Sequence, residues 1–411
     1  MAKNFLKEFP TKAELLEWYK TNGSNQVHAV NGHFHTPYSF SAFNEMNQVF
    51  ELARAENVKI LGINDFYTMA GFEEFHNLSV EYKTFPLFNI EFMGLLREEQ
   101  KSDIRVNDPN NPGRIYISGK GLDFPVELEG TSLKKLENIR SESDIQAKEM
   151  FRLASDHLEA IDPDLKLIYD QAVEKYTRGM LRERHIAKII KDKIFERYGE
   201  DKDRKVILKK IYGEADPKVN LSNTAAIEAE IRSNLLKAGG VAYVKENPKA
   251  FLDIDEVLKI ITDAGGIPAY PVLLDDKNGN YTEYEQDMEV LYKNLTSMNI
   301  YCIEFIPGRN DFDRLKDCVS FFHDRGFVVT FGTEHNTTEM FPVNITAREG
   351  KALDEELKRI NFEGACLIAA HQYNRSRKEE GFIDRNGKPR INQKDELIEL
   401  GNAVIEYFLQ N

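Results

Sequence analysis

The sequence predicts an α/β fold in which a closed β/α barrel carries a helical insertion. Strand patterns and amphipathic helix patterns alternate over residues 1–131 and again over residues 248–411, as expected when helices connect parallel strands. Between residues 132 and 247 the strand patterns stop and charged amphipathic helices replace them. No glycine-rich nucleotide-binding motif accompanies the strands, which favours a closed barrel over an open sheet.

Each element is predicted from a short pattern. Apolar residues at helical spacing predict a helix within residues 43–59, and amphipathic patterns predict others at 253–266, 281–299, 311–326 and 394–411. Short apolar runs predict strands at residues 27–30, 59–65, 84–94, 113–122, 267–271, 300–307 and 327–332. In a β/α barrel the functional site lies at the C-terminal ends of such strands.

Composition limits the classes of partner. The net charge of −14 argues against nucleic acid or an anionic membrane as a high-affinity partner, because binding phosphates requires clustered lysine and arginine. A small anionic metabolite remains compatible if a local cation or metal attracts it. The 3 cysteines include no CxxC pair, which argues against a disulfide or zinc–thiolate framework. No signal-like or membrane-length apolar run occurs, so we expect a cytoplasmic protein. The oligomeric state is left open.

Two of the 9 histidines, His33 and His35, stand one residue apart at the end of the first predicted strand. Strand geometry points both to the same side, where two imidazoles can chelate a divalent metal. A polar surface pair is the alternative for an isolated HxH. Other predicted strands also end in polar groups, and their convergence on one barrel mouth would form a metal site. These groups are Asp65, Glu91, Glu304, Glu334, His335 and Asn336.

The polar strand ends resemble the motifs of the polymerase and histidinol phosphatase (PHP) family of metal-dependent phosphoesterases. In chain order the similar segments are GHFHTPYSFS, GINDFYTMAGFEEF, NIEFMG, DAGGIPAYP, CIEFIPG and GFVVTFGTEHN. RERHIAKII and GGVAYV resemble the helical insertion of the branch that acts on small phosphoesters and nucleotides. The resemblance implies a distorted β/α barrel of seven strands, with metal ions at the strand C-termini and the insertion over the barrel mouth.

The sequence departs from the family pattern at several ligand positions. Phe66 and Tyr270 stand where the family has histidines, Asn336 stands where it has another, and Glu334 replaces an aspartate. The resemblance leaves His33, His35, Glu91 and Glu334 as metal ligands. We therefore expect one or two ions of zinc, manganese or iron rather than the family's three. Complete loss of metal is an alternative.

Six further residues are candidates for the site. Asp65, Glu304 and His335 are candidates for the catalytic group, although Asp65 would equally serve as a helix cap and Glu304 would equally pair with Arg309. Arg309, Tyr270 and His185 are candidates for substrate binding. The alternatives are an ordinary loop arginine, a tyrosine that fills the volume of a histidine, and a solvated helix histidine.

The C-terminal region carries two weaker candidates. His371 follows a short apolar run and would replace a lost ligand if it reached the barrel mouth. The mixed-charge run RSRKEEGFIDRNGKPR is typical of a solvated loop, although Arg375, Arg377 and Arg390 would bind anions if it closed over the barrel.

These patterns favour a metal-dependent hydrolase of small phosphoesters or related anionic metabolites. Two alternatives remain at this stage: a barrel enzyme with one metal and changed chemistry on a sugar or sugar acid, and a non-catalytic binding protein. Metal content together with phosphatase activity separates the three.

Overall fold

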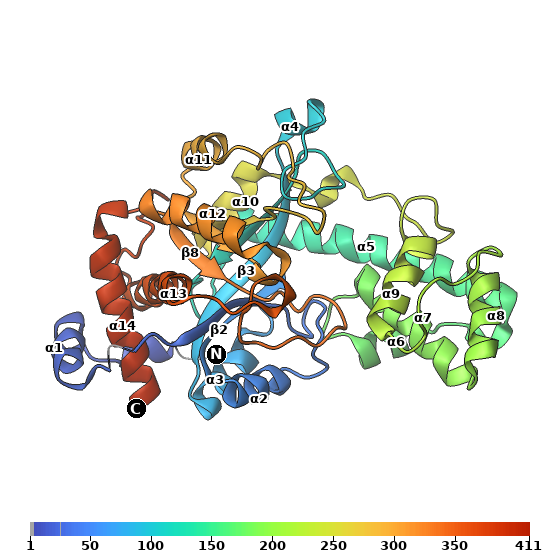
Figure 1. Ribbon diagram of the computed structural model, residues 1–411, viewed down its shortest axis with the longest axis horizontal. Coiled ribbons are helices and arrows are strands. Elements are labelled where there is room, and N and C mark those ends of the chain that lie inside the picture. Colours follow the sequence, from blue (N-terminus) through green and yellow to red (C-terminus); the bar gives the residue numbers. More distant parts are fainter. Residues whose placement is uncertain (1–3, 25) are drawn as a thin grey trace.

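The computed structural model describes residues 4–24 and 26–411, and its centre is a nearly closed barrel of seven strands (Figure 1). The spatial order is β1-β2-β3-β4-β6-β7-β8. The strands are β1 (Ala29–Phe34), β2 (Val58–Phe66), β3 (Phe85–Leu95), β4 (Arg114–Lys120), β6 (Ile267–Val272), β7 (Cys302–Phe305) and β8 (Val328–Phe331). A parallel bridge between Phe34 and Glu334 joins the two edge strands at the barrel mouth. The short strand β5 (Leu252–Asp253) pairs with the end of β3.

One strand, β4, runs against all the others. It pairs antiparallel with β3 on one side and with β6 on the other, whereas the remaining barrel pairs are parallel. Its register places Ser118 opposite Glu91 and Ala269, and it places Lys120 opposite Ile267 at the start of β6. The end of β4 therefore lies deep in the barrel, below the level of Glu91.

Helices of ordinary length pack on the outside of the barrel. They are α2 (Asn47–Ala55), α3 (Phe72–Tyr82), α10 (Ile254–Asp263), α11 (Met288–Ser297) and α12 (Phe312–Asp324). Their apolar faces join the outward-facing strand residues in one large core. The five-residue helix α4 (Arg97–Lys101) lies between β3 and β4, where a crossover helix would stand if these strands were parallel.

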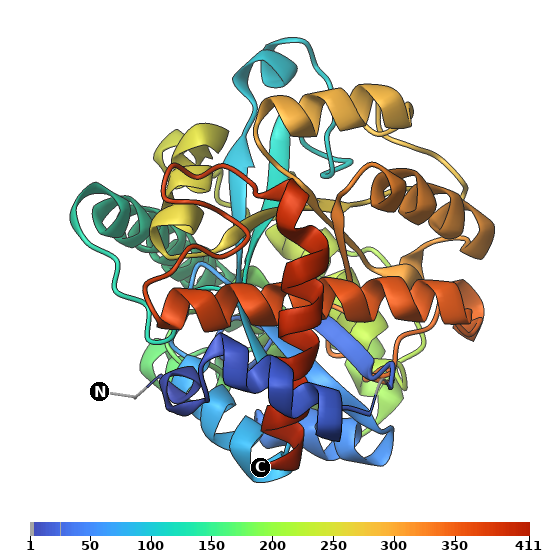
Figure 2. The same cartoon turned by 90° about the vertical axis from the view of Figure 1, so that its left-hand side faces the viewer.

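The N-terminal end of the barrel is closed by α13 (Glu355–Ser376), which α14 (Lys394–Gln410) crosses (Figure 2). Asn361 bonds the Phe331 N–H (2.8 Å) and the Val30 carbonyl (3.2 Å), so a buried amide satisfies two strand backbones. The packing is close: a Cβ on Gly364 would lie 1.9 Å from the Val329 oxygen, and one on Gly401 would lie 1.6 Å from the Cys366 oxygen. The helix α1 (Lys12–Asn22) packs beside α14.

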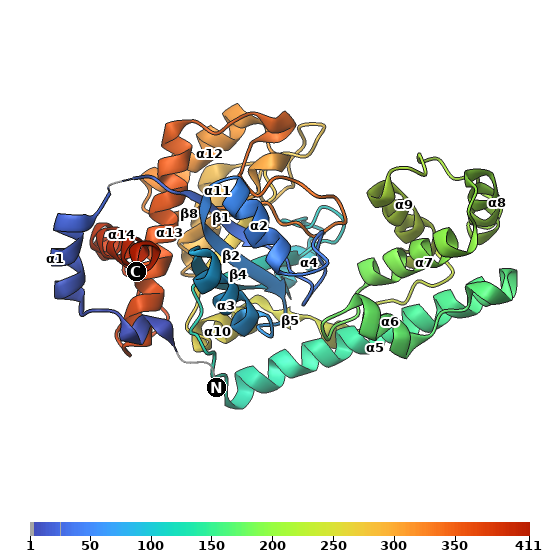
Figure 3. The same ribbon diagram turned by 90° about the horizontal axis from the view of Figure 1, so that it is seen from below.

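Between β4 and β5 the chain forms a long helical excursion. It contains α5 (Gly130–Ile161), α6 (Tyr169–Tyr176), α7 (Glu183–Arg197), α8 (Asp201–Ile211) and α9 (Thr224–Ile231), with a hydrophobic core of their own. Figure 3 shows α5 leaving the barrel and α6–α9 lying beyond it, on the side opposite to α13 and α14. Among the residues that the structure describes, no helix is both long enough and apolar enough to cross a membrane.

Candidate metal centre

His33 and His35 lie at the mouth end of β1, and their rings meet a carboxylate from β3. Their Nε2 atoms are 3.3 Å apart, and His35 Nε2 lies 3.2 Å from Glu91 Oε2. All three side chains are buried, and each offers one ligand atom within 4.8 Å of the others. Hence two strands that are distant in sequence bring two imidazoles and one carboxylate to a single point.

Hydrogen bonds fix the tautomer of each imidazole. His33 Nδ1 lies 2.9 Å from Glu304 Oε2, so Nδ1 carries the proton and Nε2 keeps its lone pair. His35 Nδ1 lies 3.1 Å from Ser39 Oγ, which donates its own hydrogen to Asp65 (2.6 Å). Ser39 can therefore only accept from His35, and His35 Nε2 is also a free lone pair. Asp65 does not cap α3, which begins after Gly71. It fixes the loop after β1 and orients His35.

The converging donors fit a divalent cation. Tetrahedral coordination with bonds of about 2.0–2.1 Å places ligand atoms about 3.3 Å apart, which matches the separations of 3.2 and 3.3 Å. Without an ion, the lone pairs of His33 and His35 would face each other, and a proton on Glu91 would have to fill the space beside His35 Nε2. Burial lowers the pKa of His35 to about 4 and raises the pKa of Glu91 to about 8. A nitrogen–oxygen donor set of this kind suits zinc, manganese or iron.

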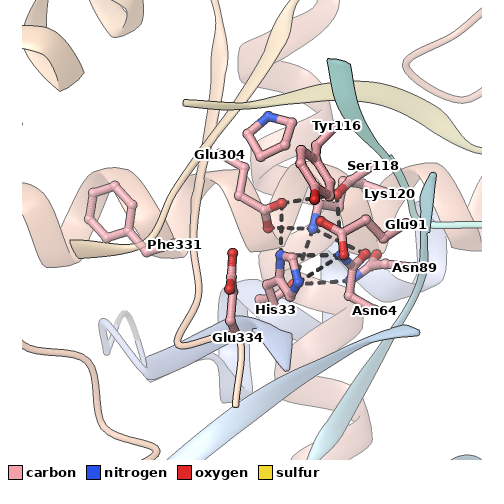
Figure 4. Close-up of polar contacts among 12 residues, drawn as sticks. His33, Asn64, Asn89, Glu91, Tyr116, Ser118, Lys120, Glu304, Phe331 and Glu334 are labelled. Carbon is pink, nitrogen blue, oxygen red and sulfur yellow. Dashed lines mark hydrogen bonds and ion pairs between the residues drawn. The ribbon is translucent and has the colours of Figure 1, made fainter. Parts of the chain in front are cut away.

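Glu304 is a partner of the metal ligands and does not line the pocket. It forms an ion pair with the fully buried Lys120, accepts from Ser118 Oγ (3.1 Å) and accepts the His33 Nδ1 proton, as Figure 4 shows. Burial opposes its ionisation, but the interactions with His33 and Lys120, which both donate to it, outweigh that effect and hold its pKa at about 2. The alternative pairing of Glu304 with Arg309 is wrong, because Arg309 binds Glu334 instead.

Glu334 is not one of the group of three, although it lines the same cavity. Arg309 donates to both carboxylate oxygens of Glu334, with an Nη1–Oε1 distance of 2.8 Å. The side-chain amide of Asn336 also donates to the Glu334 carboxylate (2.6 Å). The His335 side chain does not join the group of three. Its Nε2 lies 2.9 Å from the Phe341 carbonyl oxygen, and its ring stacks on Phe43. The structure thus places His335 as an anchor of the loop after β8 and not in the pocket.

Two of the three substrate-binding candidates lie outside the pocket. Tyr270 is fully buried in the core and donates its hydroxyl to Glu285 (2.7 Å), so its hydroxyl is held away from the pocket. His185 is buried in α7, where its Nδ1 accepts from the Arg182 N–H (3.0 Å) and its ring contacts Phe40. It stabilises the start of a helix. Arg309 does line the pocket.

The C-terminal candidates lie at the opposite end of the barrel. His371 bonds the Gly265 carbonyl through Nε2 (2.6 Å) and accepts the Phe382 N–H at Nδ1 (2.9 Å), so it is not a replacement ligand. Arg375 pairs with Asp123, Arg377 donates to carbonyls near the N-terminus, and Arg390 donates to those of Glu380 and Gly381. These arginines fasten the tail to the barrel and do not close over its mouth.

A cavity of about 530 Å³ joins the group of three ligands to the helical excursion. Its barrel side includes His35, Glu91 and Glu334, and its other side is formed by α5, α7 and neighbouring segments. The cations along it include Arg114, Arg232, Lys237 and Arg309, each paired with a carboxylate, together with Arg182 and Arg184.

Arg182 and Arg184 differ from the other pocket cations. Within the described part of the chain neither forms an ion pair, and Arg182 Nη2 is buried without a hydrogen-bond partner. Burial lowers the pKa of Arg184 to about 10. The Arg182 guanidinium lies 4.9 Å from the Phe66 ring centre, and Phe66 in turn stacks on His35. An unpaired cation therefore stands close to the ligands, at the positive N-terminus of α7.

Sequence reasoning missed Asn64, Ser118, Lys120, Arg182 and Arg184. Ser118 and Lys120 could have been found from the two-residue period of RIYISGK. Ile115 and Ile117 point outward to the core between strands and helices, and the alternate residues point into the barrel. The Asn64 amide nitrogen lies 3.0 and 3.1 Å from the two ring nitrogens of His33, which places it over the ring face. No sequence signal separates Arg182 or Arg184 from the many other cations of the excursion.

Comparisons with known proteins establish the fold. No protein-family model and no curated protein matches the sequence. Among solved structures, an assigned metal-dependent phosphoesterase of Bifidobacterium adolescentis is similar with a TM-score of 0.50 and 15% identity, over 82% of this chain and 96% of that one. An amidohydrolase of Chromobacterium violaceum with bound sulfate is similar with a TM-score of 0.47 and 16% identity, over 78% and 93%. The chain therefore shares its distorted barrel fold with the first of these proteins.

Proposed function

We propose that this protein is a PHP-type hydrolase that uses one divalent metal ion on a small anionic phosphoester. The observation that carries the proposal is the convergence of His33 Nε2, His35 Nε2 and Glu91 at the edge of the cavity. An ion held there would polarise a phosphoryl oxygen and lower the pKa of a bound water molecule. The likeness to a metal-dependent phosphoesterase fold supports the same reaction class.

The chain's own residues would divide the remaining work. Glu304 and the Ser39–Asp65 pair keep a proton on Nδ1 of His33 and His35, so that both Nε2 atoms face the ion. Arg182 and Arg184 would bind the substrate anion, because guanidinium groups match phosphate and carboxylate geometry. The helical excursion would cover the mouth and select the substrate by shape.

A sugar acid or related carboxylate is the second candidate substrate. Its support is the small donor set, since a phosphoryl transfer clamped by two ions would need ligands beyond His33, His35 and Glu91. The unpaired Arg182 and Arg184 would hold a carboxylate as readily as a phosphate. Binding of an anion by these arginines would therefore not by itself identify the reaction.

The test is a substrate screen with the full chain. Protein stripped of metal and then loaded with zinc, manganese or iron would be assayed for phosphate release from a panel of phosphomonoesters and for conversion of sugar acids. We expect activity that requires added metal and that H33Q/H35Q loses while remaining folded. Equal activity of the metal-free protein or of H33Q/H35Q would refute a metal-dependent reaction. Turnover of sugar acids alone would select the second candidate.

A further inference from the structure

The most unusual buried group outside the ligand set is the ammonium of Lys120. The side chain is fully buried, and its Nζ lies near three oxygen atoms: Glu304 Oε1, Asn64 Oδ1 (3.4 Å) and the Gly32 carbonyl (3.5 Å). A buried charge is costly unless it is paired and hydrogen-bonded. Here Glu304 supplies the pairing charge (Figure 4), and the Asn64 and Gly32 oxygens lie at the limit of hydrogen-bonding distance.

Lys120 is connected to the proposed metal ligands through a single carboxylate. One oxygen of Glu304 binds Lys120, and the other accepts from His33 Nδ1 and from Ser118. Glu304 is therefore engaged on both oxygens, and three of its four acceptor sites are occupied. Without Lys120 its charge would face an imidazole and a hydroxyl only.

Two of the carboxylates beside the ligand set are each held by a protein cation. Lys120 holds Glu304, and Arg309 holds both oxygens of Glu334. Glu91 is then the carboxylate within the group of three that is left to balance an ion's charge. A second divalent ion in this buried volume would add two positive charges, while Glu304 and Glu334 are already paired with protein cations.

We propose that Lys120 takes the place of a second metal ion and is a positioning residue for His33. Its ammonium fixes Glu304 as the acceptor of the His33 Nδ1 proton and restricts the centre to one ion. The inference rests on the proposed function for the identity of that ion's ligands. The connection from Lys120 to the His33 tautomer holds in the metal-free protein as well.

The stoichiometric test compares four full-length proteins by equilibrium titration with Mn²⁺ and elemental analysis. The unaltered chain should bind one ion. Lys120→Met frees a buried carboxylate and should raise the stoichiometry to two, and K120M/E304Q should return it to one. Lys394→Met is the matched control, because Lys394 is a partly buried lysine that donates to the Phe327 carbonyl rather than to a carboxylate. It should still bind one ion.

Glu304→Gln tests the positioning role while Lys120 itself is left unchanged. We expect E304Q to bind one ion about 10–100-fold more weakly, as is typical when a partner of a metal-bound histidine is lost. In metal-free protein, ¹⁵N NMR of the imidazoles should show His33 protonated on Nδ1 in the unaltered chain. The other tautomer should become populated in E304Q and in K120M.

The outcomes separate this inference from the proposed function. Two or more ions in the unaltered chain, or one ion with unchanged affinity in folded K120M, would overturn the role of Lys120. An unaltered chain that binds no ion would refute the proposed function, and the His33 tautomer would then decide whether the Lys120–Glu304 connection is real. If K120M does not fold, the unaltered stoichiometry and the E304Q affinity and NMR measurements remain decisive.

Discussion

Single hydrogen bonds decide what the two histidines can do. In each ring, Nδ1 is committed to a neighbouring oxygen, which leaves Nε2 as a lone pair. The lone pair of His35 faces Glu91, and that of His33 faces His35 Nε2. Ser39 has a specific part in this arrangement, because its hydroxyl must donate to Asp65 and can only accept from His35. The chemistry of the centre therefore depends on residues that do not themselves touch an ion.

Ser39→Ala should weaken metal binding. The variant removes the acceptor of the His35 Nδ1 proton, so the ring is free to adopt the wrong tautomer, and we expect an affinity about tenfold lower. Calorimetric titration with Mn²⁺ measures it. Ser79→Ala is the matched control, since Ser79 is also buried but donates to the Phe75 carbonyl within α3. Unchanged affinity in S39A would show that the bond has no orienting role.

Arg182 and Arg184 should govern the affinity for the substrate anion. Replacing either by glutamine removes a charge-assisted hydrogen bond worth about 1.5–3 kcal/mol, so binding of inorganic phosphate should weaken by roughly 10–100-fold. Metal content should stay the same. Arg178→Gln is the control, because Arg178 is exposed and pairs with Glu45. A fall in metal content in R182Q or R184Q, with unaltered phosphate affinity, would contradict an anion-binding role.

The two lost family histidines should behave differently when restored. Phe66 stacks on the His35 ring at 5.7 Å, so Phe66→His adds a donor beside the centre and should raise metal occupancy. Tyr270 points into the core toward Glu285, so Tyr270→His should leave occupancy unchanged. We expect weak hydrolysis of nitrophenyl phosphate by the unaltered protein, because one ion offsets less developing charge than several. Brisk hydrolysis with three ions bound would contradict this.

At the scale of elements, strands and helices could be predicted from the sequence where apolar residues form a run or recur at a regular spacing. The predicted strands at 59–65 and 84–94 correspond to β2 and β3 within two residues, because apolar runs and a following helix limit them. The direction of β4 was not predicted, although the absence of a crossover helix between residues 95 and 114 is a usable signal. The helix α13 was missed because it is buried on all sides and so shows no amphipathic period.

The same distinction applies to the candidate site. Strand-end residues could be predicted because a barrel gathers them, and the structure brings three of the four predicted ligands together. The fourth, Glu334, forms an ion pair with Arg309. The spacing of residues in the sequence does not predict which cation pairs with a given carboxylate. The loop after β8 also takes positive φ at Glu334 and His335, which turns their side chains in ways that a strand period does not describe.

The pairing of α13 with the tail should depend on pH through His371. Burial lowers its pKa to about 4, and the Phe382 N–H requires an unprotonated Nδ1. The unfolded chain therefore takes up a proton near its ordinary pKa of about 6.5, before the folded chain does. Neutral His371 therefore contributes its full amount to the free energy of unfolding above about pH 6.5, and this contribution is lost as pH falls toward 4. The full amount is at most about 3 kcal/mol.

The difference in unfolding free energy between the unaltered chain and His371→Gln measures this effect. It should be largest at pH 7 and should shrink steadily toward pH 4, in denaturant titrations at each pH. A difference that is the same at both values would show that His371 does not titrate with unfolding.

For the molecule as a whole, the net charge is −14, yet one cavity is lined by two arginines, Arg182 and Arg184, that form no ion pair within the described residues. Arg182 and Arg184 come from the helical excursion, whereas His33, His35 and Glu91 come from the barrel. The cavity lies between the two parts, so the proposed anion-binding and metal-binding groups would face each other only when both parts are in place. If the proposed function holds, this arrangement would allow an acidic protein to attract a small anionic substrate.

The central claim is that His33, His35 and Glu91 together hold one divalent ion. The most direct measurement is a crystal structure of the full chain saturated with Mn²⁺, with anomalous scattering used to locate the metal. The account predicts one anomalous peak at bonding distance from His33 Nε2, His35 Nε2 and a Glu91 oxygen, with Lys120 still on Glu304. No peak at these atoms, or a second ion bound to Glu304 or Glu334, would contradict it.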